Sequence, residues 1–438
     1  MTTPWSAAAR SRTLGICLSV ALASSCKNHE PPITLVYPHG SSFQADYLTR
    51  GVALSQQFSQ TTGIQVSDVP VPEGTREQLT FFRGLLQRTP AGLDLLETDT
   101  IWPRLLEGDL ADLRPQMAAE IALIAPQLLP SYTIGDKIVG IPYDVYIGSL
   151  EYRSDLLAAY GYDHPPRTWD ELAVMAKRIQ DGERAKGRSE FWGFVWQGAE
   201  AESLTCNALE WQFGEGGGRI VEDDHTVSVN NAAAIRSWER ATRWIGSISP
   251  PAVVAYRERD SMGVFDSGNA AFNRLWLGTS NARSVPFSEV RWRNGESRVP
   301  SGFTRIPGGP RAQAGTMGGS GLSVSLRSAH PREAMTMVQF LIKSRVESLE
   351  KRRHESSKDQ FYVQPDPGRG DGSLEPQAVV HRPSIETGSK YAQVSAAYAA
   401  AIHSVLTGKQ KAAAAAAALE QELVTLTGFR AGSPKNAR

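Results

Sequence analysis

The residues best suited to chemistry lie between positions 191 and 218, where six aromatic residues fall within 28 positions. Aromatic residues make up 8% of the chain, so about two would be expected there. Flat rings stack on the C–H faces of sugars, and amides or carboxylates such as those of Gln197, Glu200 and Glu202 bond hydroxyl groups. The stretch therefore suits sugar binding. The alternative is an aromatic core strand followed by a solvated helix start.

Carboxylates elsewhere add a second set of candidates. Asp99 and Asp144, with Glu200 and Glu202, offer strong acceptors for hydroxyl groups, or the acid/base pair that hydrolysis of a glycosidic bond needs. For Asp99 the alternative is an N-cap of a helix over 101–107. The chain contains no H-E-x-x-H, no G-x-S-x-G and no phosphate-binding glycine motif. We therefore expect no cofactor and no metal.

The elements that must position these residues begin with an alternation of strands and helices. It predicts a parallel α/β sheet, and in such sheets ligands bind beyond the carboxyl ends of the strands. Asp99 and Trp102 follow the third strand, so both are predicted to line a cleft. The expected strands are 33–37, 64–71 and 92–97, and the expected helices are 47–60 and 76–87.

The run 138–151, IVGIPYDVYIGSLE, is long enough to leave one sheet and enter another. Tyr143, Asp144 and Tyr146 would then lie at the crossing. Six glycines between 308 and 321 indicate close backbone approach or a hinge, and the polar stretch 352–377 indicates a surface excursion. Further strands are expected at 191–196, 303–306 and 322–326, and helices at 155–160, from 168, 199–213, 232–245, 331–343, 391–406 and 410–427, while 265–272 reads as turn-rich.

Composition limits the class of protein. A chain of 438 residues suggests two large lobes, and its 46 basic residues balance 46 acidic ones. No global charge therefore draws nucleic acid, and the apolar runs after residue 30 are too short to cross a bilayer.

The first 26 residues predict export. Arg10 and Arg12 precede an uncharged stretch ending in LASS, and Cys26 follows. This ending resembles a bacterial lipobox. The resemblance implies acylation of Cys26, with residues 27–32 as a short peptide tether. The alternative is an ordinary cleavage site near a chance cysteine. With Cys26 acylated no disulfide can form within the mature chain, and Cys206 is predicted to be a small buried residue.

Several motifs together resemble the extracellular solute-binding proteins of bacterial ABC sugar importers, in the trehalose/maltose-binding subgroup. The similarity spans about 33–343 and 382–428. The strongest motif pair is FWGFVWQG at 191–198 with LTCNALEW at 204–211. The others are DLLETD at 94–99 with Trp102, GIP at 140–142 running to LEYR at 150–153, PRTWDEL at 166–172, GNAAF at 268–272 with Trp276, Gly318-Gly319, and RPS at 382–384.

The resemblance implies an α/β fold of the type II periplasmic-binding-protein kind. Two lobes would be joined by three crossings around a central cleft. Lobe 1 would hold 33–141 and 321–350, and lobe 2 would hold 142–320 and 351–438. Closure of the lobes on a sugar would present a surface to the permease subunits. A lipid-anchored monomer, at the cell surface or in the periplasm, is the form implied.

By position, the resemblance gives Asp99 and Arg382 hydroxyl-bonding roles and makes Trp276 a stacking platform. Gly318 and Gly319 would let backbone amides approach the sugar, and Gln197 and Glu202 lie in the matching turn. Three departures put trehalose itself in doubt, since lost hydroxyl partners change specificity most: Tyr146 stands where an acidic residue is common, Leu275 replaces Asn, and Ala201 replaces an aromatic residue. A secreted glycosidase and a sugar-sensing subunit of the same fold remain the alternatives.

Overall fold

The computed structural model describes residues 32–38, 45–72, 74–90, 92–278, 299–355 and 378–435. The predicted signal peptide and Cys26 lie outside these residues, as does all but the beginning of the polar stretch 352–377. Within the described part of the chain, no helix combines the length and the hydropathy that a membrane crossing needs.

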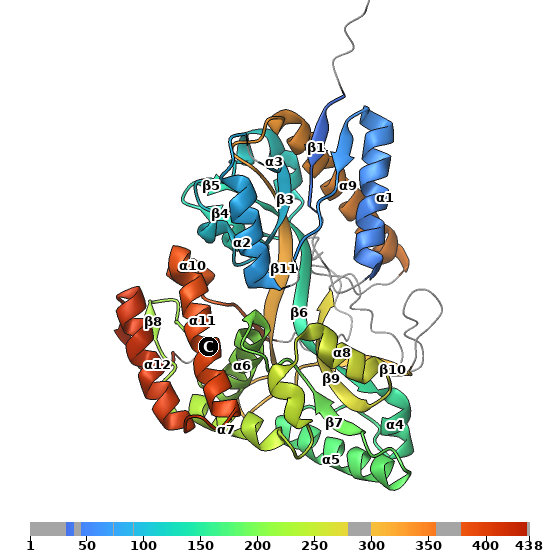
Figure 1. The fold of residues 1–438 in the computed structure, drawn as a ribbon, viewed down its shortest axis with the longest axis vertical. Helices are drawn as coiled ribbons and strands as arrows, with labels where there is room; N and C mark the ends of the chain where they lie inside the picture. Colours follow the sequence, from blue (N-terminus) through green and yellow to red (C-terminus); the bar gives the residue numbers. More distant parts are fainter. Residues whose placement is uncertain are drawn as a thin grey trace, which may run out of the picture. The chain divides into compact units, whose positions relative to one another are not determined.

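Two long strands connect two separate hydrophobic cores. β6 (Ile141–Arg153) and β11 (Ala314–Val324) pair antiparallel and run side by side (Figure 1). The first half of β6 adds Tyr143 and Val145 to one core, and its second half adds Leu150 and Tyr152 to another. The long extended run predicted from the sequence is therefore confirmed as a strand shared by two lobes, here called lobe 1 and lobe 2 after their cores.

Lobe 1 contains the alternating strands and helices expected near the N-terminus. β1 and β2 pair in parallel, as predicted. β3 instead pairs antiparallel with β11, which returns from lobe 2 in the opposite direction, so the prediction of an all-parallel sheet is wrong here. The elements are β1 (Thr34–Val36), α1 (Ala45–Thr62), β2 (Gln65–Ser67), α2 (Thr75–Leu86), β3 (Leu95–Asp99), η1 (Pro103–Leu105), α3 (Arg114–Ala122), η2 (Pro126–Leu128), η3 (Pro130–Tyr132), β4 (Thr133–Ile134), β5 (Lys137–Ile138) and α9 (Pro331–Glu355).

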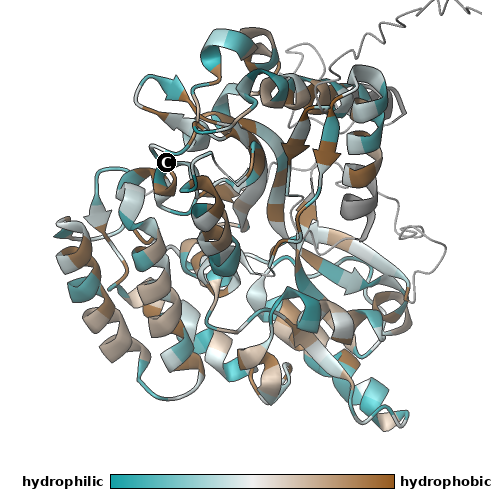
Figure 2. Cartoon of the chain, turned by 45° about the horizontal axis from the view of Figure 1, so that its top comes forward, coloured by the Kyte–Doolittle hydropathy of each residue, from teal (hydrophilic) through white to brown (hydrophobic). Residues whose placement is uncertain are grey.

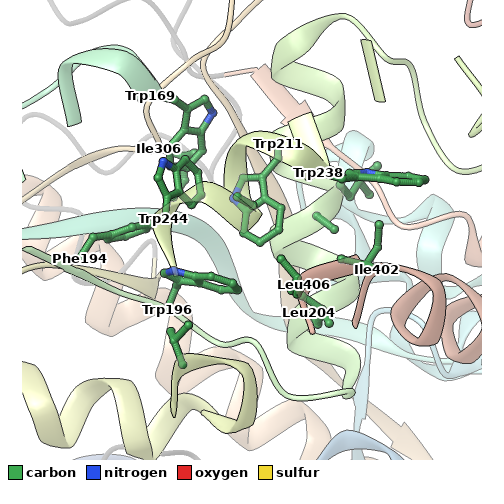
Figure 3. Close-up of a cluster of buried hydrophobic side chains, with 14 of the residues drawn as sticks. Trp169, Phe194, Trp196, Leu204, Trp211, Trp238, Trp244, Ile306, Ile402 and Leu406 are labelled. Carbon is green, nitrogen blue, oxygen red and sulfur yellow. The ribbon is translucent and has the colours of Figure 1, made fainter. Parts of the chain in front are cut away.

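Lobe 2 surrounds an aromatic core (Figure 3). The elements are α4 (Ser154–Ala159), α5 (Trp169–Ala185), β7 (Trp192–Val195), α6 (Glu202–Glu215), β8 (Thr226–Val227), α7 (Ala232–Trp244), η4 (Pro251–Ala255), α8 (Glu258–Asp266), β9 (Ala270–Gly278), β10 (Ser301–Arg305), β12 (Ala378–Val380), α10 (Ser384–Thr387), η5 (Gly388–Lys390), α11 (Tyr391–Leu406), α12 (Ala412–Thr427) and β13 (Arg430–Ala431).

The aromatic stretch at 191–218 belongs to that core, so the interpretation as an aromatic core strand is confirmed and the interpretation as a sugar-binding surface is wrong. Phe191, Trp196 and Trp211 are buried, and the ring centroids of Trp196 and Trp211 lie 5.1 Å apart, edge to face. The ring centroids of Trp211 and Trp244 lie 5.7 Å apart. Large rings that pack against one another exclude water and stabilise the lobe, but they offer no face to a ligand.

The glycine-rich run was predicted to be a hinge or a site of close backbone approach before a strand at 322. The close approach is confirmed, because a Cβ at Gly319 would lie 2.2 Å from the Asp144 carbonyl oxygen, but the run forms most of β11, which begins at Ala314. The region 265–272, expected to be turns, contains the end of α8 and the start of β9. Both differences have one cause: glycine has low strand propensity, and the strands here are set by their neighbours in the sheet.

Most predicted helices are confirmed, because their apolar residues recur at helical spacing. Thr168 caps α5, with its hydroxyl accepting from the Glu171 amide at 3.1 Å. Figure 2 shows apolar and polar residues interleaved along the helices, as expected where one helix face meets a core. The residue boundaries proposed for the two lobes stay predictions, since a core cluster does not define a boundary.

Candidate functional site

Arg382 stands at the centre of a buried network between the two lobes. It follows β12, and only 3% of its side chain is exposed. Nη2 donates to Asp99 Oδ1 at 2.9 Å and to Thr100 Oγ1 at 3.0 Å, both at the end of β3 in lobe 1. Nη1 donates to Glu202 Oε1 at 3.1 Å, at the start of α6 in lobe 2. One guanidinium group thus joins carboxylates of both lobes.

Residues of α11 complete the network. The Tyr391 hydroxyl donates to Glu202 Oε1, and the Ser395 hydroxyl donates to Glu202 Oε2 at 2.6 Å. The Tyr391 ring packs into the core of lobe 1, while later residues of α11 such as Tyr398 pack into lobe 2. Burial and the neighbouring Glu202 carboxylate raise the pKa of Tyr391 well above its usual value, so its hydroxyl keeps the proton it donates.

Asp99 is the member of the network that reaches solvent. Its Oδ1 takes bonds from Thr100, Ile101 and Arg382, and within the described chain Oδ2 takes none. Its side chain is 23% exposed. Burial raises the pKa of Asp99. The positive charge of Arg382 acts against this rise, and the negative charge of Glu202 adds to it. The bond from the Ile101 amide, at 3.2 Å, means that Asp99 also caps the turn that precedes η1, which replaces the helix expected over 101–107.

Trp276 forms the second part of the site. It lies on β9, half-buried. The Arg274 guanidinium carbon lies 4.1 Å from the Trp276 ring centroid. A Cβ added at Gly318 of β11 would come within 3.0 Å of the ring. The indole therefore lies close over Gly318, where any added side chain would have to displace the ring by a few tenths of an ångström.

The sheet places these residues on neighbouring strands. Asp99 pairs with Ser320, Gly318 pairs with Tyr146, and the Thr100 amide donates to the Gly319 carbonyl at 3.2 Å. β6 also pairs with β9, whose Trp276 extends over β6 as far as Gly318. Asp99, Tyr146, Trp276, Gly318 and Gly319 thus lie on four successive strands, β3, β11, β6 and β9.

Three predicted residues are not available for a ligand in this structure. Trp102 packs against Phe82 in the lobe 1 core, with ring centroids 5.6 Å apart. Tyr143 is buried in that lobe's other core. Gln197 is buried in lobe 2, where Nε2 donates to Ser261 Oγ at 2.7 Å and to the Arg274 carbonyl at 2.8 Å. All three are buried in this structure, and a direct contact of any of them with a ligand stays a prediction.

The remaining carboxylates also have protein partners. Asp144 is buried and pairs with Arg345 of α9. Glu200 is half exposed and lies 3.8 Å from the His403 ring, away from the Arg382 network. Asp99 and Glu202 share one arginine.

The sequence reasoning missed Thr100, Tyr391, Gly148, Glu210 and Arg274. The pattern Arg274-x-Trp276 was one usable signal, since residues two apart on a strand share a face. Gly148 inside a long strand was another, because glycine there marks a close approach. No local signal links Tyr391 to Glu202, which lie 189 positions apart.

Comparisons with known proteins fit this arrangement. Residues 40–347 match the family model of bacterial extracellular solute-binding proteins. The chain belongs to that family. This chain is also 34% identical over 422 residues to a probable ABC transporter-binding protein of Deinococcus radiodurans. The match covers 94% of this chain and 97% of the relative.

Solved structures show the same two-lobe fold for this solute-binding protein. T. maritima MalE3 with maltose bound superposes with a TM-score of 0.73 at 27% identity, covering 90% of this chain and 99% of MalE3. A solute-binding protein of Thermotoga lettingae TMO, bound with α-D-tagatose, also gives 0.73, at 19% identity, covering 90% of this chain and all of the other. The periplasmic-binding-protein fold expected from the sequence is therefore confirmed.

Proposed function

We propose that this protein is the substrate-binding component of an ABC sugar importer and holds a neutral sugar between its lobes. The observation that carries the proposal is Asp99, whose Oδ1 is fixed by three donors while its side chain is 23% exposed and its Oδ2 accepts no hydrogen bond within the described part of the chain. A carboxylate held this way accepts a hydroxyl hydrogen bond without further ordering. The half-buried Trp276 ring supplies the apolar surface for the C–H face of the sugar.

Likeness to the maltose-bound MalE3 supports a disaccharide such as maltose or trehalose as the ligand. Fold neighbours with bound tagatose and ribitol widen the range of sugars worth testing. A thermal-shift screen over neutral mono- and disaccharides and polyols identifies the ligand, because a ligand that binds only the folded state raises the melting temperature. No shift with any of them would contradict the proposal.

The Trp276→Ala variant tests the site itself. Removing the ring removes the stacking surface, so we expect the affinity for the identified sugar to fall at least about tenfold, equivalent to ~1.4 kcal/mol, measured by calorimetry. Trp192→Ala is the matched control, since Trp192 is also half-buried and stacked by an arginine, Arg184 at 4.3 Å, but lies on β7. Equal affinities in both variants would contradict the role of Trp276.

Export as a monomeric lipoprotein that delivers the unaltered sugar to permease subunits belongs to the same proposal. Metabolic labelling with a radioactive fatty acid checks acylation, and Cys26→Ala is its control. Label retained in that variant would contradict the assignment of Cys26. A glycosidase would release product from the bound disaccharide in proportion to protein, and we expect none.

A further inference from the structure

Arg274 and Glu210 form a buried ion pair beneath Trp276. Their side chains are 1% and 0% exposed. Arg274 Nη2 and Nε donate to the two Glu210 oxygens at 2.6 and 3.3 Å, as a fork. A buried ion pair contributes little net stability compared with apolar residues of similar volume. Its presence therefore points to a role other than holding lobe 2 together.

The pair is anchored on three sides. Glu210 belongs to α6, and its Oε1 also accepts from the Thr316 amide of β11 at 3.1 Å. The Arg274 carbonyl accepts from Gln197 Nε2 at 2.8 Å. Both ends of the Arg274 residue, backbone and guanidinium, are thus fixed by other elements, so the plane of the guanidinium group has a set orientation.

Two glycines make room for this arrangement. A Cβ at Gly148 of β6 would lie 1.8 Å from Glu210 Oε1 and 2.8 Å from Arg274 Nη2. Any other residue there would displace the ion pair. Gly318 plays the same part for the Trp276 ring, as described above. The sheet surface is therefore shaped to hold Glu210, Arg274 and Trp276 as one unit.

We propose that Arg274 is a positioning residue: together with Glu210 it forms a clamp that packs on the Trp276 ring and holds the ring over Gly318, in the orientation that meets a sugar. This inference rests on the proposed sugar-binding function. Glu210, and Glu258 of α8, which also interacts electrostatically with Arg274, offset the arginine charge. The clamp thus fixes the ring while leaving the binding face suited to neutral C–H groups.

The test removes the clamp without leaving a buried charge. The Arg274→Met/Glu210→Gln double variant loses both charges but keeps an acceptor for the Thr316 amide. Arg274→Lys is the second variant, which keeps the charge and loses the planar stack. Arg184→Met is the control, because it removes an arginine from another tryptophan ring, Trp192.

Two readouts are compared in protein labelled with 5-fluorotryptophan. The ¹⁹F resonance of Trp276, assigned by its loss in Trp276→Phe, reports the ring without any ligand. We expect it to shift and broaden in the Arg274 variants but not in Arg184→Met, and sugar affinity to fall at least tenfold. An unchanged resonance in a folded Arg274 variant would overturn the inference, as would unchanged affinity. If the wild type binds no sugar, the proposed function fails, and the resonance alone decides whether the clamp exists.

Discussion

Glu151 shows, at the scale of one residue, how burial changes a carboxyl group. It lies on β6 inside lobe 2, 3% exposed, with Oε2 accepting from Asn273 Nδ2 at 3.3 Å. Burial raises its pKa to about 8, and Asp266 adds to the rise. At neutral pH the folded protein therefore holds a proton on Glu151 that the unfolded chain releases.

The Glu151→Gln variant should remove a pH dependence of stability. Because the folded pKa exceeds the unfolded value of 4.5, the wild type loses stability as pH rises from about 4.5 to about 8, by a total of several kcal/mol. Glutamine stays neutral and keeps the hydrogen bond to Asn273, so the variant should be the more stable protein at pH 8. Urea unfolding at pH 5 and pH 8 measures both.

The control for this measurement is Glu77→Gln. It changes a half-exposed carboxylate whose Oε1 lies 3.4 Å from Arg257 Nη2. It should leave the pH dependence as it is in the wild type. A Glu151→Gln profile parallel to that of the wild type would contradict the raised pKa.

Side-chain roles were predicted from the sequence only where they depend on residue type alone. A carboxylate at Asp99 and a buried thiol at Cys206 were found where expected. The positions of the Trp102 and Gln197 side chains were not predicted correctly. Burial decides them, and burial depends on elements that are distant in the chain. Aromatic clustering likewise cannot distinguish an internal core from a binding surface.

At the scale of an element, β11 depends on its glycines. Gly319 has φ of 138° and its hydrogen atoms face the backbone of β6, where a Cβ would lie 2.2 Å from the Asp144 carbonyl oxygen. The register between β11 and β6 shifts at the next residue pair, Ser320 and Gly321. The strand thus uses glycine to bring lobe 1 and lobe 2 segments of β6 into one ladder.

The Gly319→Ala variant should destabilise the protein by at least about 2 kcal/mol. An alanine at this φ is strained, and its Cβ would clash with the β6 backbone, which cannot move away as a side chain could. Guanidinium unfolding measures the loss. Gly263→Ala serves as the comparison: it lies in α8 with no heavy atom near its added Cβ, and alanine there should stabilise the helix by up to about 1 kcal/mol. Similar effects from both changes would show that β11 tolerates a side chain.

Elements with regular periodicity were predicted well, and those set by pairing were not. α11 was predicted at its observed bounds, Tyr391–Leu406, since its apolar residues repeat at helical spacing. The first eight residues of β11 carry glycine, threonine and methionine without alternation. Only the neighbouring strands β12, β6 and β3 make them a strand.

At the scale of the whole molecule, Arg382 and Tyr391 add contacts between lobes that the strands alone do not supply. β6 and β11 connect the lobes covalently, but paired strands can bend. Arg382 bonds Asp99 and Thr100 on one side and Glu202 on the other, and its side chain is only 3% exposed. Bonds to charged groups under such conditions are stronger than those at the surface.

The Arg382→Met variant should therefore separate the lobes as well as destabilise them. It leaves the carboxylates of Asp99 and Glu202 close together without their cation, which costs about 3 kcal/mol of stability by comparison with other broken buried pairs. The repulsion between them favours a more open arrangement, so small-angle scattering of the sugar-free variant should give a larger radius of gyration. Because burial raises the pKa of Asp99, protonation of this carboxylate at low pH should weaken both effects. Arg114→Met, which breaks a partly exposed pair with Asp112 at 2.9 Å within lobe 1, should leave the radius of gyration unchanged and cost less stability than Arg382→Met. A radius equal to that of the wild type at neutral pH would show that Arg382 does not hold the lobes together.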